Sequence, residues 1–333
     1  MALRAGAIRF NTDLSQMEIY DGNQWTGILA TSPEIETGGG RGVFFGGAPS
    51  NNAAIDFITI STTGNAQDFG DMASHRVQGA AAGSRTRGLY AGGEAPSIVN
   101  TIEFITFSSQ GTDAQDFGDI SSNQYRRMNG MGCGNQTRGL FSGGWTGSAT
   151  SNHIDYVTIA QTGNSVDFGD LSVNRESGSC CASQTRGIIH GGRNQPANTA
   201  LDSIDYVTIS TLGDAADFGN LTDGRFAMQS CSNSIRGLTF AGKVPSNSDI
   251  IDYITIASLG NSLDFGDTIS SMEYPLGAVA SPIRGVVAGG LTPSASNVIQ
   301  YVQIPTVGNA LDFGDLQHSK SEASGCSNSH GGL

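Results

Sequence analysis

The sequence predicts an all-β chain built from six copies of one unit, on the strength of three observations. The pair Arg-Gly recurs about every 48 residues from Arg41 to Arg284. Each pair opens a short apolar run that usually ends in Gly-Gly, and a second β-branched run and an Asp-Phe-Gly sequence follow it. No stretch keeps the 3.6-residue apolar period of an amphipathic helix, so helices should be almost absent.

Each copy contains four short segments of β-branched, aromatic or small residues, separated by Gly, Asn and Asp. This pattern is typical of four antiparallel strands joined by tight turns. Four strands per repeat of this length indicate the blades of a β-propeller, because leucine-rich and tetratricopeptide repeats are shorter. We therefore expect a six-bladed propeller over residues 41–333.

Two sets of repeated residues are predicted to be structural. The aspartates either cap turn N–H groups or meet the arginines, and we favour an Arg–Asp contact, between or within blades, that recurs six times and holds the ring together. The arginines are Arg41, Arg87, Arg138, Arg186, Arg236 and Arg284. The aspartates are Asp68, Asp116, Asp167, Asp217, Asp264 and Asp312. A further basic residue lies eleven positions before most Arg-Gly pairs, but the last such position holds Glu273.

The small-residue segment of one blade is displaced to the other end of the chain. Only five such segments lie between the six Arg-Gly runs, and Cys326-Ser327-Asn328-Ser329 repeats Cys231-Ser232-Asn233-Ser234. We expect residues 320–329 to return as the inner strand of the first blade, which would leave no open edge between the first and last blades.

Four of the five cysteines occupy one repeat position, where other copies have Ala82 and Val279. Equivalent positions in different blades should be too far apart to pair. We therefore predict small buried core residues rather than disulfides or metal ligands.

The unit resembles the kelch repeat in its basic residue, its small-residue strand, its Gly-Gly run and its later aromatic position. The resemblance covers residues 41–333, with Phe where kelch repeats usually have Trp. It implies that the small-residue strand is innermost, where blades crowd together.

Residues 1–30 lie outside the repeat and are predicted to form a three-stranded β-meander over 7–11, 16–20 and 24–28. Residues 31–40 should be a linker. The stretch from Gly6 to Trp25 resembles a short module of bacteriophage tail fibres. Because about 25 residues cannot bury a core alone, it should pack on the propeller, on its own copies or on another virion protein.

The charge and the apolar pattern exclude several classes. The net charge of −13 and pI of about 4.6 argue against binding phosphate backbones. Residues 1–10 have no apolar core of a signal peptide, and no apolar run approaches a membrane span.

No catalytic constellation or cofactor site is recognisable. The six Asp-Phe-Gly sequences lack the other kinase motifs, the histidines have no zinc-ligand spacing, and no EF-hand spacing surrounds the acidic turns. Calcium binding by those turns stays open as an alternative.

The second-to-third loops differ between copies, whereas the third-to-fourth turns are nearly uniform Gly-Asn or Gly-Asp pairs. Variable loops on a rigid scaffold are common recognition sites. The candidate ligand-binding residues are Trp145, His153, Arg193 and Lys243.

Together these features lead us to expect a non-enzymatic structural protein of a tailed-phage virion, such as that of a cyanophage, assembled in the host cytoplasm. It would be a tail fibre, tail or surface component, oligomeric in the particle, that presents its propeller to a host glycan or to another virion protein. Two alternatives are a glycan-processing propeller enzyme and a structural component with no receptor role. An intracellular kelch adaptor is a third class.

If residues 320–333 close the ring, their deletion should destabilise every blade. Thermal unfolding followed by circular dichroism should show a lower midpoint for the truncated chain. An unchanged midpoint would refute ring closure.

Overall fold

The computed structural model describes residues 4, 6–11, 16–28, 40–49, 53–94, 96–120, 130–195 and 197–333. The chain divides into two compact units, Met1–Gly38 and Gly39–Leu333. The described residues form strands, turns and loops without any helix, so the all-β prediction is confirmed. None of their segments is a helix long and apolar enough to span a bilayer. The predicted linker, 31–40, lies outside the described residues except for Gly40.

The first unit is an antiparallel sheet of β1 (Ile8–Asn11), β2 (Gln16–Tyr20) and β3 (Trp25–Ile28), as the sequence predicted. The carboxylate of Asp21 accepts hydrogen bonds from the N–H groups of Gln24 and Asn23, which hold its pKa below the usual value and shape the second turn. Arg9 pairs with Glu18 at 2.7 Å, and its guanidinium lies 4.2 Å from the centre of the Trp25 ring.

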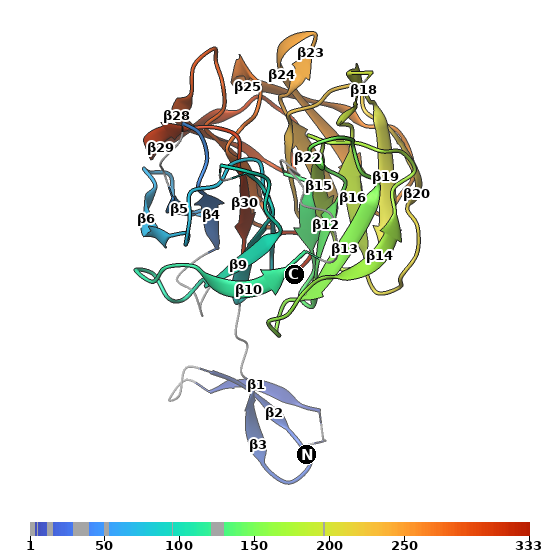
Figure 1. Cartoon of the computed structure of the whole chain (residues 1–333). Coiled ribbons are helices and arrows are strands. Elements are labelled where there is room, and N and C mark those ends of the chain that lie inside the picture. Colours follow the sequence, from blue (N-terminus) through green and yellow to red (C-terminus); the bar gives the residue numbers. More distant parts are fainter. Residues whose placement is uncertain are drawn as a thin grey trace. The chain divides into compact units, whose positions relative to one another are not determined.

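The second unit contains six sheets with a core of four antiparallel strands each, which we number by their Arg-Gly strands (Figure 1). The first is β30 (Ser324–Ser327), β4 (Arg41–Phe45), β5 (Ala54–Thr59) and β6 (Gln67–Asp71). The second is β7 (Ala80–Gly83), β8 (Arg87–Ala91), β9 (Thr101–Thr106) and β10 (Gln115–Asp119). The third is β11 (Gly132–Gly134), β12 (Arg138–Ser142), β13 (His153–Thr158) and β14 (Val166–Asp170).

The remaining three sheets follow the same order. The fourth is β15 (Ser179–Ala182), β16 (Arg186–His190), β19 (Ser203–Thr208) and β20 (Ala216–Asn220). The fifth is β21 (Gln229–Ser232), β22 (Arg236–Phe240), β24 (Ser246–Thr255) and β25 (Leu263–Met272). The sixth is β26 (Gly277–Ala280), β27 (Arg284–Ala288), β28 (Ser296–Gln303) and β29 (Leu311–Lys320). Short strands β17 (Arg193–Asn194), β18 (Thr199–Ala200) and β23 (Lys243–Val244) lie in loops.

The predicted return of the distal segment is confirmed, because β30 pairs with β4 in the register Cys326↔Val43. Figure 1 shows the dark red β30 beside the blue β4. The first strands of the sheets, here called the inner strands, contact one another in the order β7, β11, β15, β21, β26, β30 and back to β7.

The glycine of each Arg-Gly pair faces a small side chain on the inner strand of the preceding sheet. A Cβ on Gly237 would lie 2.6 Å from Sγ of Cys181, and one on Gly42 would lie 2.5 Å from Cγ2 of Val279. The cysteines are therefore spacers between sheets. All five are buried and free, which confirms the prediction made for the four at the repeat position, and burial raises the pKa of the Cys181, Cys231 and Cys326 thiols.

The arginine of each pair links its sheet to the following one, but the predicted Arg–Asp contact is wrong. Each guanidinium donates to a backbone carbonyl just after the third strand of the next sheet, at 2.6–3.0 Å. The pairs are Arg41–Phe107, Arg87–Ile159, Arg138–Ile209, Arg186–Ile256, Arg236–Ile304 and Arg284–Ile60. The last pair joins the sixth sheet to the first.

The six aspartates named above are exposed and form no ion pair with these arginines in the described part of the chain. The phenylalanines of the Asp-Phe-Gly sequences support the arginines instead. Each Phe packs edge-on against an aromatic ring of its own sheet, and that ring also lies beneath the arginine, as in Phe265, Tyr253 and Arg236. The exposed aspartates are solvated, whereas the carbonyl at the strand end accepts a hydrogen bond from the partly buried guanidinium.

The uniform third-to-fourth turns also connect neighbouring sheets. The Asn65 side chain accepts from the N–H of Asp315, and the N–H of Gly64 donates to Phe313, which again joins the first sheet to the sixth. Equivalent bonds occur at all six junctions. Their near-uniform sequence follows from this repeated contact.

A second set of basic residues is buried and paired with acids on third strands. Arg76 meets Glu103 at 3.0 Å, Arg175 meets Asp205 at 3.0 Å and Lys320 meets Asp56 at 2.9 Å. Arg225 pairs with Asp252 in the same way. The basic residue at the corresponding position before Arg138 is Arg127, which lies outside the described residues.

In the sixth sheet the register differs from the sequence alignment. Met272 occupies the basic position and Glu273 the next one, since Glu273 bridges Leu291 as Phe226 bridges Lys243. Gln300 replaces the acid, and both Met272 and Gln300 are buried. Replacing both partners avoids an uncompensated buried charge.

We expect Gly237→Ala to destabilise the protein by about 1–3 kcal/mol, because its Cβ would overlap the Cys181 thiol. Urea unfolding would measure this, with Gly139→Ala as the matched control, since its nearest neighbour is the Ala82 Cβ at 3.3 Å. Adding Cys181→Ala should restore part of the loss. Equal losses at positions 237 and 139, or no recovery in the double variant, would contradict this role of the glycine.

Candidate functional site

The loops that follow the second strands of the third to sixth sheets are joined by hydrogen bonds in two pairs, and we call their described residues, 145–152, 193–195, 197–202, 243–249 and 291–295, the loop belt. The Thr150 hydroxyl lies 3.2 Å from Oδ1 of Asn194, which joins the third loop to the fourth. The Asn247 amide donates to the carbonyl of Leu291 at 2.9 Å and joins the fifth loop to the sixth. Each of these variable segments is thus hydrogen-bonded to one neighbouring loop.

Two predicted site residues belong to the third sheet. Trp145 forms a backbone bridge with Thr150 and is partly exposed. His153 begins β13, and its Nδ1 lies 3.1 Å from Oδ1 of Asp170, with both side chains nearly half exposed. A contact of this exposure contributes little to stability.

Arg193 is more constrained than the sequence indicated. Its Nε donates to Glu176 at 3.0 Å, and its guanidinium lies 4.7 Å from the centre of the Phe226 ring in the next inter-sheet link. The Glu176 side chain is buried, so Arg193 compensates a charge that water reaches poorly.

Lys243 repeats this arrangement one sheet further on. Its Nζ lies 2.9 Å from Glu273, and its backbone bridges Phe226, the residue on which Arg193 lies. The structure therefore brings Arg193 and Lys243 together through Phe226. Their charges already have partners, so a ligand would meet the outer faces of these pairs and the loop amides.

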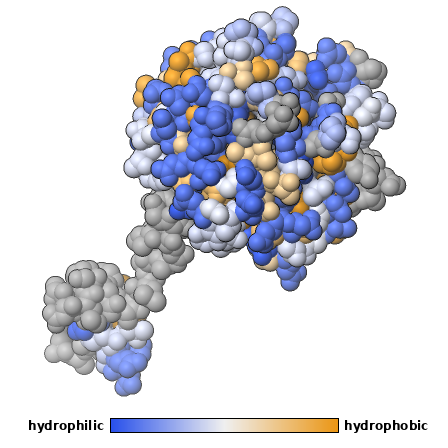
Figure 2. Space-filling view, turned by 60° about the vertical axis from the view of Figure 1, so that its left-hand side comes forward, coloured by the Kyte–Doolittle hydropathy of each residue, from blue (hydrophilic) through white to orange (hydrophobic). Residues whose placement is uncertain are grey.

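Exposed apolar side chains mark a second surface that sequence reasoning missed. Leu212, Leu259 and Val307 lie next to the glycine of the third-to-fourth turns and are more than half exposed, where the first and third copies have Thr63 and Thr162. The face seen in Figure 2 is mainly hydrophilic, with smaller hydrophobic areas among the polar residues. In the sequence, these positions differ between copies by a change from threonine to leucine or valine.

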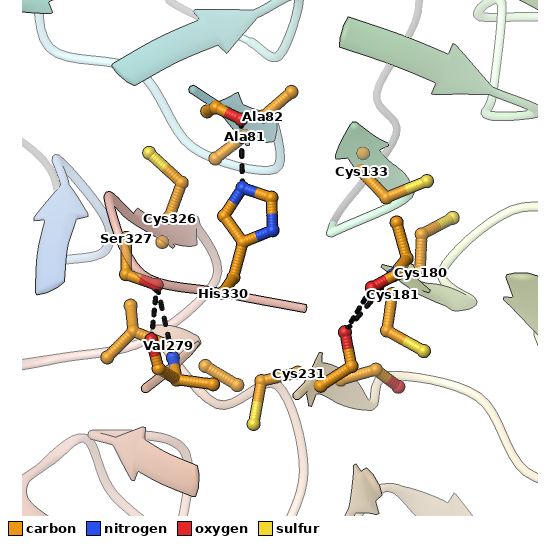
Figure 3. A pocket seen from close by; sticks show the side chains of 18 of the residues that line it. Ala81, Ala82, Cys133, Cys180, Cys181, Cys231, Val279, Cys326, Ser327 and His330 are labelled. Atoms are coloured by element: carbon orange, nitrogen blue, oxygen red, sulfur yellow. Dashed lines mark hydrogen bonds between the residues drawn. The ribbon is translucent and has the colours of Figure 1, made fainter. Parts of the chain in front are cut away.

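A small cavity lies among the inner strands, with a volume of about 40 Å³ (Figure 3). It is lined mostly by Gly, Ala, Ser and Cys, and the His330 side chain enters it. This volume admits only a few water molecules. Among the described residues, no group of three His, Cys, Asp or Glu side chains has the arrangement of a metal site.

No protein-family model and no curated protein matches this chain.

We expect Arg193→Ala to lower the free energy of unfolding by about 1–3 kcal/mol, because it leaves Glu176 buried without its cation. Lys243→Ala is the matched control, since its pair is more exposed and should contribute about 1 kcal/mol or less. Urea unfolding of both variants compares the two values. A smaller loss for Arg193→Ala than for Lys243→Ala would be inconsistent with a structural role of the Arg193 pair.

Proposed function

We propose that the six sheets are the blades of a closed, kelch-like β-propeller. The cyclic order of the inner strands supports this arrangement, as do the bonds from Arg284 to Ile60 and from Gly64 to Phe313 between the last and first sheets. The pairing of β30 with β4 has the same effect, because it places both ends of the repeat region in one sheet.

On this scaffold the protein acts as a non-enzymatic structural component of a tailed-phage virion, in the tail, a tail fibre or the particle surface. The virion assignment rests on the resemblance of the N-terminal module to tail-fibre segments. Residues 1–30 attach the protein to other virion proteins or to its own copies. Their register gives one sheet face the positions of Ile8 and Ile19, both exposed, and the other face the Arg9–Glu18 pair.

The single observation that supports a recognition role is the loop belt. Its members come from four sheets, vary in length and composition, and are cross-linked by hydrogen bonds onto a laterally bonded scaffold. Such a surface is preorganised, so binding would order few side chains. Aromatic and polar groups such as Trp145 and His153 suit a host-surface glycan or another virion protein.

Electron microscopy of purified particles, with a label on the N-terminus, tests the virion assignment. We expect the label at a fixed position on the tail or surface, and absence from the particles would refute the assignment.

Binding of the full-length protein to a glycan array then tests the receptor role, with Trp145→Ala reducing binding at least tenfold and His75→Ala as a control outside the loop belt. Labelled particles without glycan binding would support the purely structural alternative, and glycan cleavage would support the enzymatic one.

A further inference from the structure

The segment Asn328–Leu333, here called the cap segment, contacts the inner part of all six sheets. Asn328 donates its N–H to Arg41 of the first sheet, and Oγ of Ser329 donates to Ala280 of the sixth. The N–H of Gly331 donates to Ser232 of the fifth, and the carbonyl of Leu333 accepts from Gln184 of the fourth. His330 and Gly332 meet the second and third sheets.

Close backbone approach explains the two glycines of the cap segment. A Cβ on Gly331 would lie 2.1 Å from the carbonyl oxygen of Asn233, and one on Gly332 would lie 2.0 Å from that of Gly134. The cap segment therefore lies directly against the ends of the inner strands, beside the cavity that they line (Figure 3).

His330 is held in one tautomer by this contact. Its Nε2 lies 2.8 Å from the carbonyl oxygen of Gly83, and its Nδ1 lies 3.1 Å from the N–H of Gly332. A carbonyl only accepts and an amide N–H only donates, so Nε2 carries the proton and Nδ1 is bare. Protonation of Nδ1 would set two donors against each other and remove the acceptor that holds Gly332.

The surroundings of the ring offer nothing that would compensate an imidazolium. Among the described residues that line the cavity, the other titratable groups are the thiols of the five cysteines. Burial or thiol hydrogen bonding raises the pKa of Cys133, Cys181, Cys231 and Cys326, so these thiols stay neutral. No Asp, Glu, Lys or Arg is among the lining residues.

We propose that the cap segment is an acid-labile closure of the cavity, and that protonation of His330 releases Asn328–Leu333 from the inner strands. Burial lowers the pKa of His330 to about 4 in the closed state, against about 6.5 for a solvated histidine. Between these values only the open state binds the proton, so closure weakens as the pH falls from 6.5 to 4. Above pH 6.5 closure is independent of pH, and below 4 the loss levels off.

Hydrogen–deuterium exchange of the full chain, read by mass spectrometry and corrected for intrinsic rates, tests this proposal. Between pH 7.5 and 4.5 the amides of Gly331 and Gly332 should lose roughly 10- to 100-fold of their protection. The control is His330→Gln, whose amide can still donate to Gly83 but does not titrate. Its cap segment should exchange independently of pH, although the buried His190 remains.

Unchanged protection of the unsubstituted protein at pH 4.5 would overturn the proposal, and so would an equal pH response of His330→Gln. Should that variant not fold, the NMR titration of His330 decides. A midpoint well below 6.5 that coincides with cap release supports the closure. A midpoint near 6.5 without release refutes it.

Discussion

The second unit depends on one repeated contact, in which the Arg-Gly strand of each sheet meets both of its neighbours. Glycine allows the strand to approach the small inner residue of the preceding sheet, as Gly237 approaches Cys181. The adjacent arginine donates to a carbonyl of the following sheet, as Arg236 does to Ile304. Two consecutive residues therefore set the spacing on one side and the attachment on the other.

The buried ion pairs stabilise the links between sheets in a different way. Each arginine bonds an acid of the sheet it enters, a carbonyl just after the second strand and a carbonyl near the start of the third strand, as Arg175 does with Asp205, Gly191 and Ser203. Burial lowers the pKa of Arg175, and Asp205 opposes that shift. The sixth sheet uses neutral Met272 and Gln300 at these positions, so packing can replace charge when both partners change together.

These contacts between sheets explain which parts of the chain can differ from copy to copy. The inner strands, the Arg-Gly pairs and the third-to-fourth turns each contact a neighbouring sheet, so their residues cannot vary without changing that contact. Fewer residues of the loop belt contact a neighbouring sheet, although Arg193 and Lys243 show that parts of it also join sheets. The candidate ligand-binding face is thus narrower than the loops as a whole.

The sequence by itself determined the strand content, the four-stranded unit and the return of residues 320–329, because these follow from local periodicity and from counting copies. It also predicted that the cysteines are buried in the core and that the N-terminal residues form a three-stranded meander. Only the tertiary structure decided the partners of the arginines, the register at Met272 and the place of the cap segment. Equivalent positions in a repeat show that a contact recurs. They do not show whether a guanidinium binds a carboxylate or a carbonyl, because both candidate partners lie far from it in the sequence. That choice depends on burial, which chain order does not reveal.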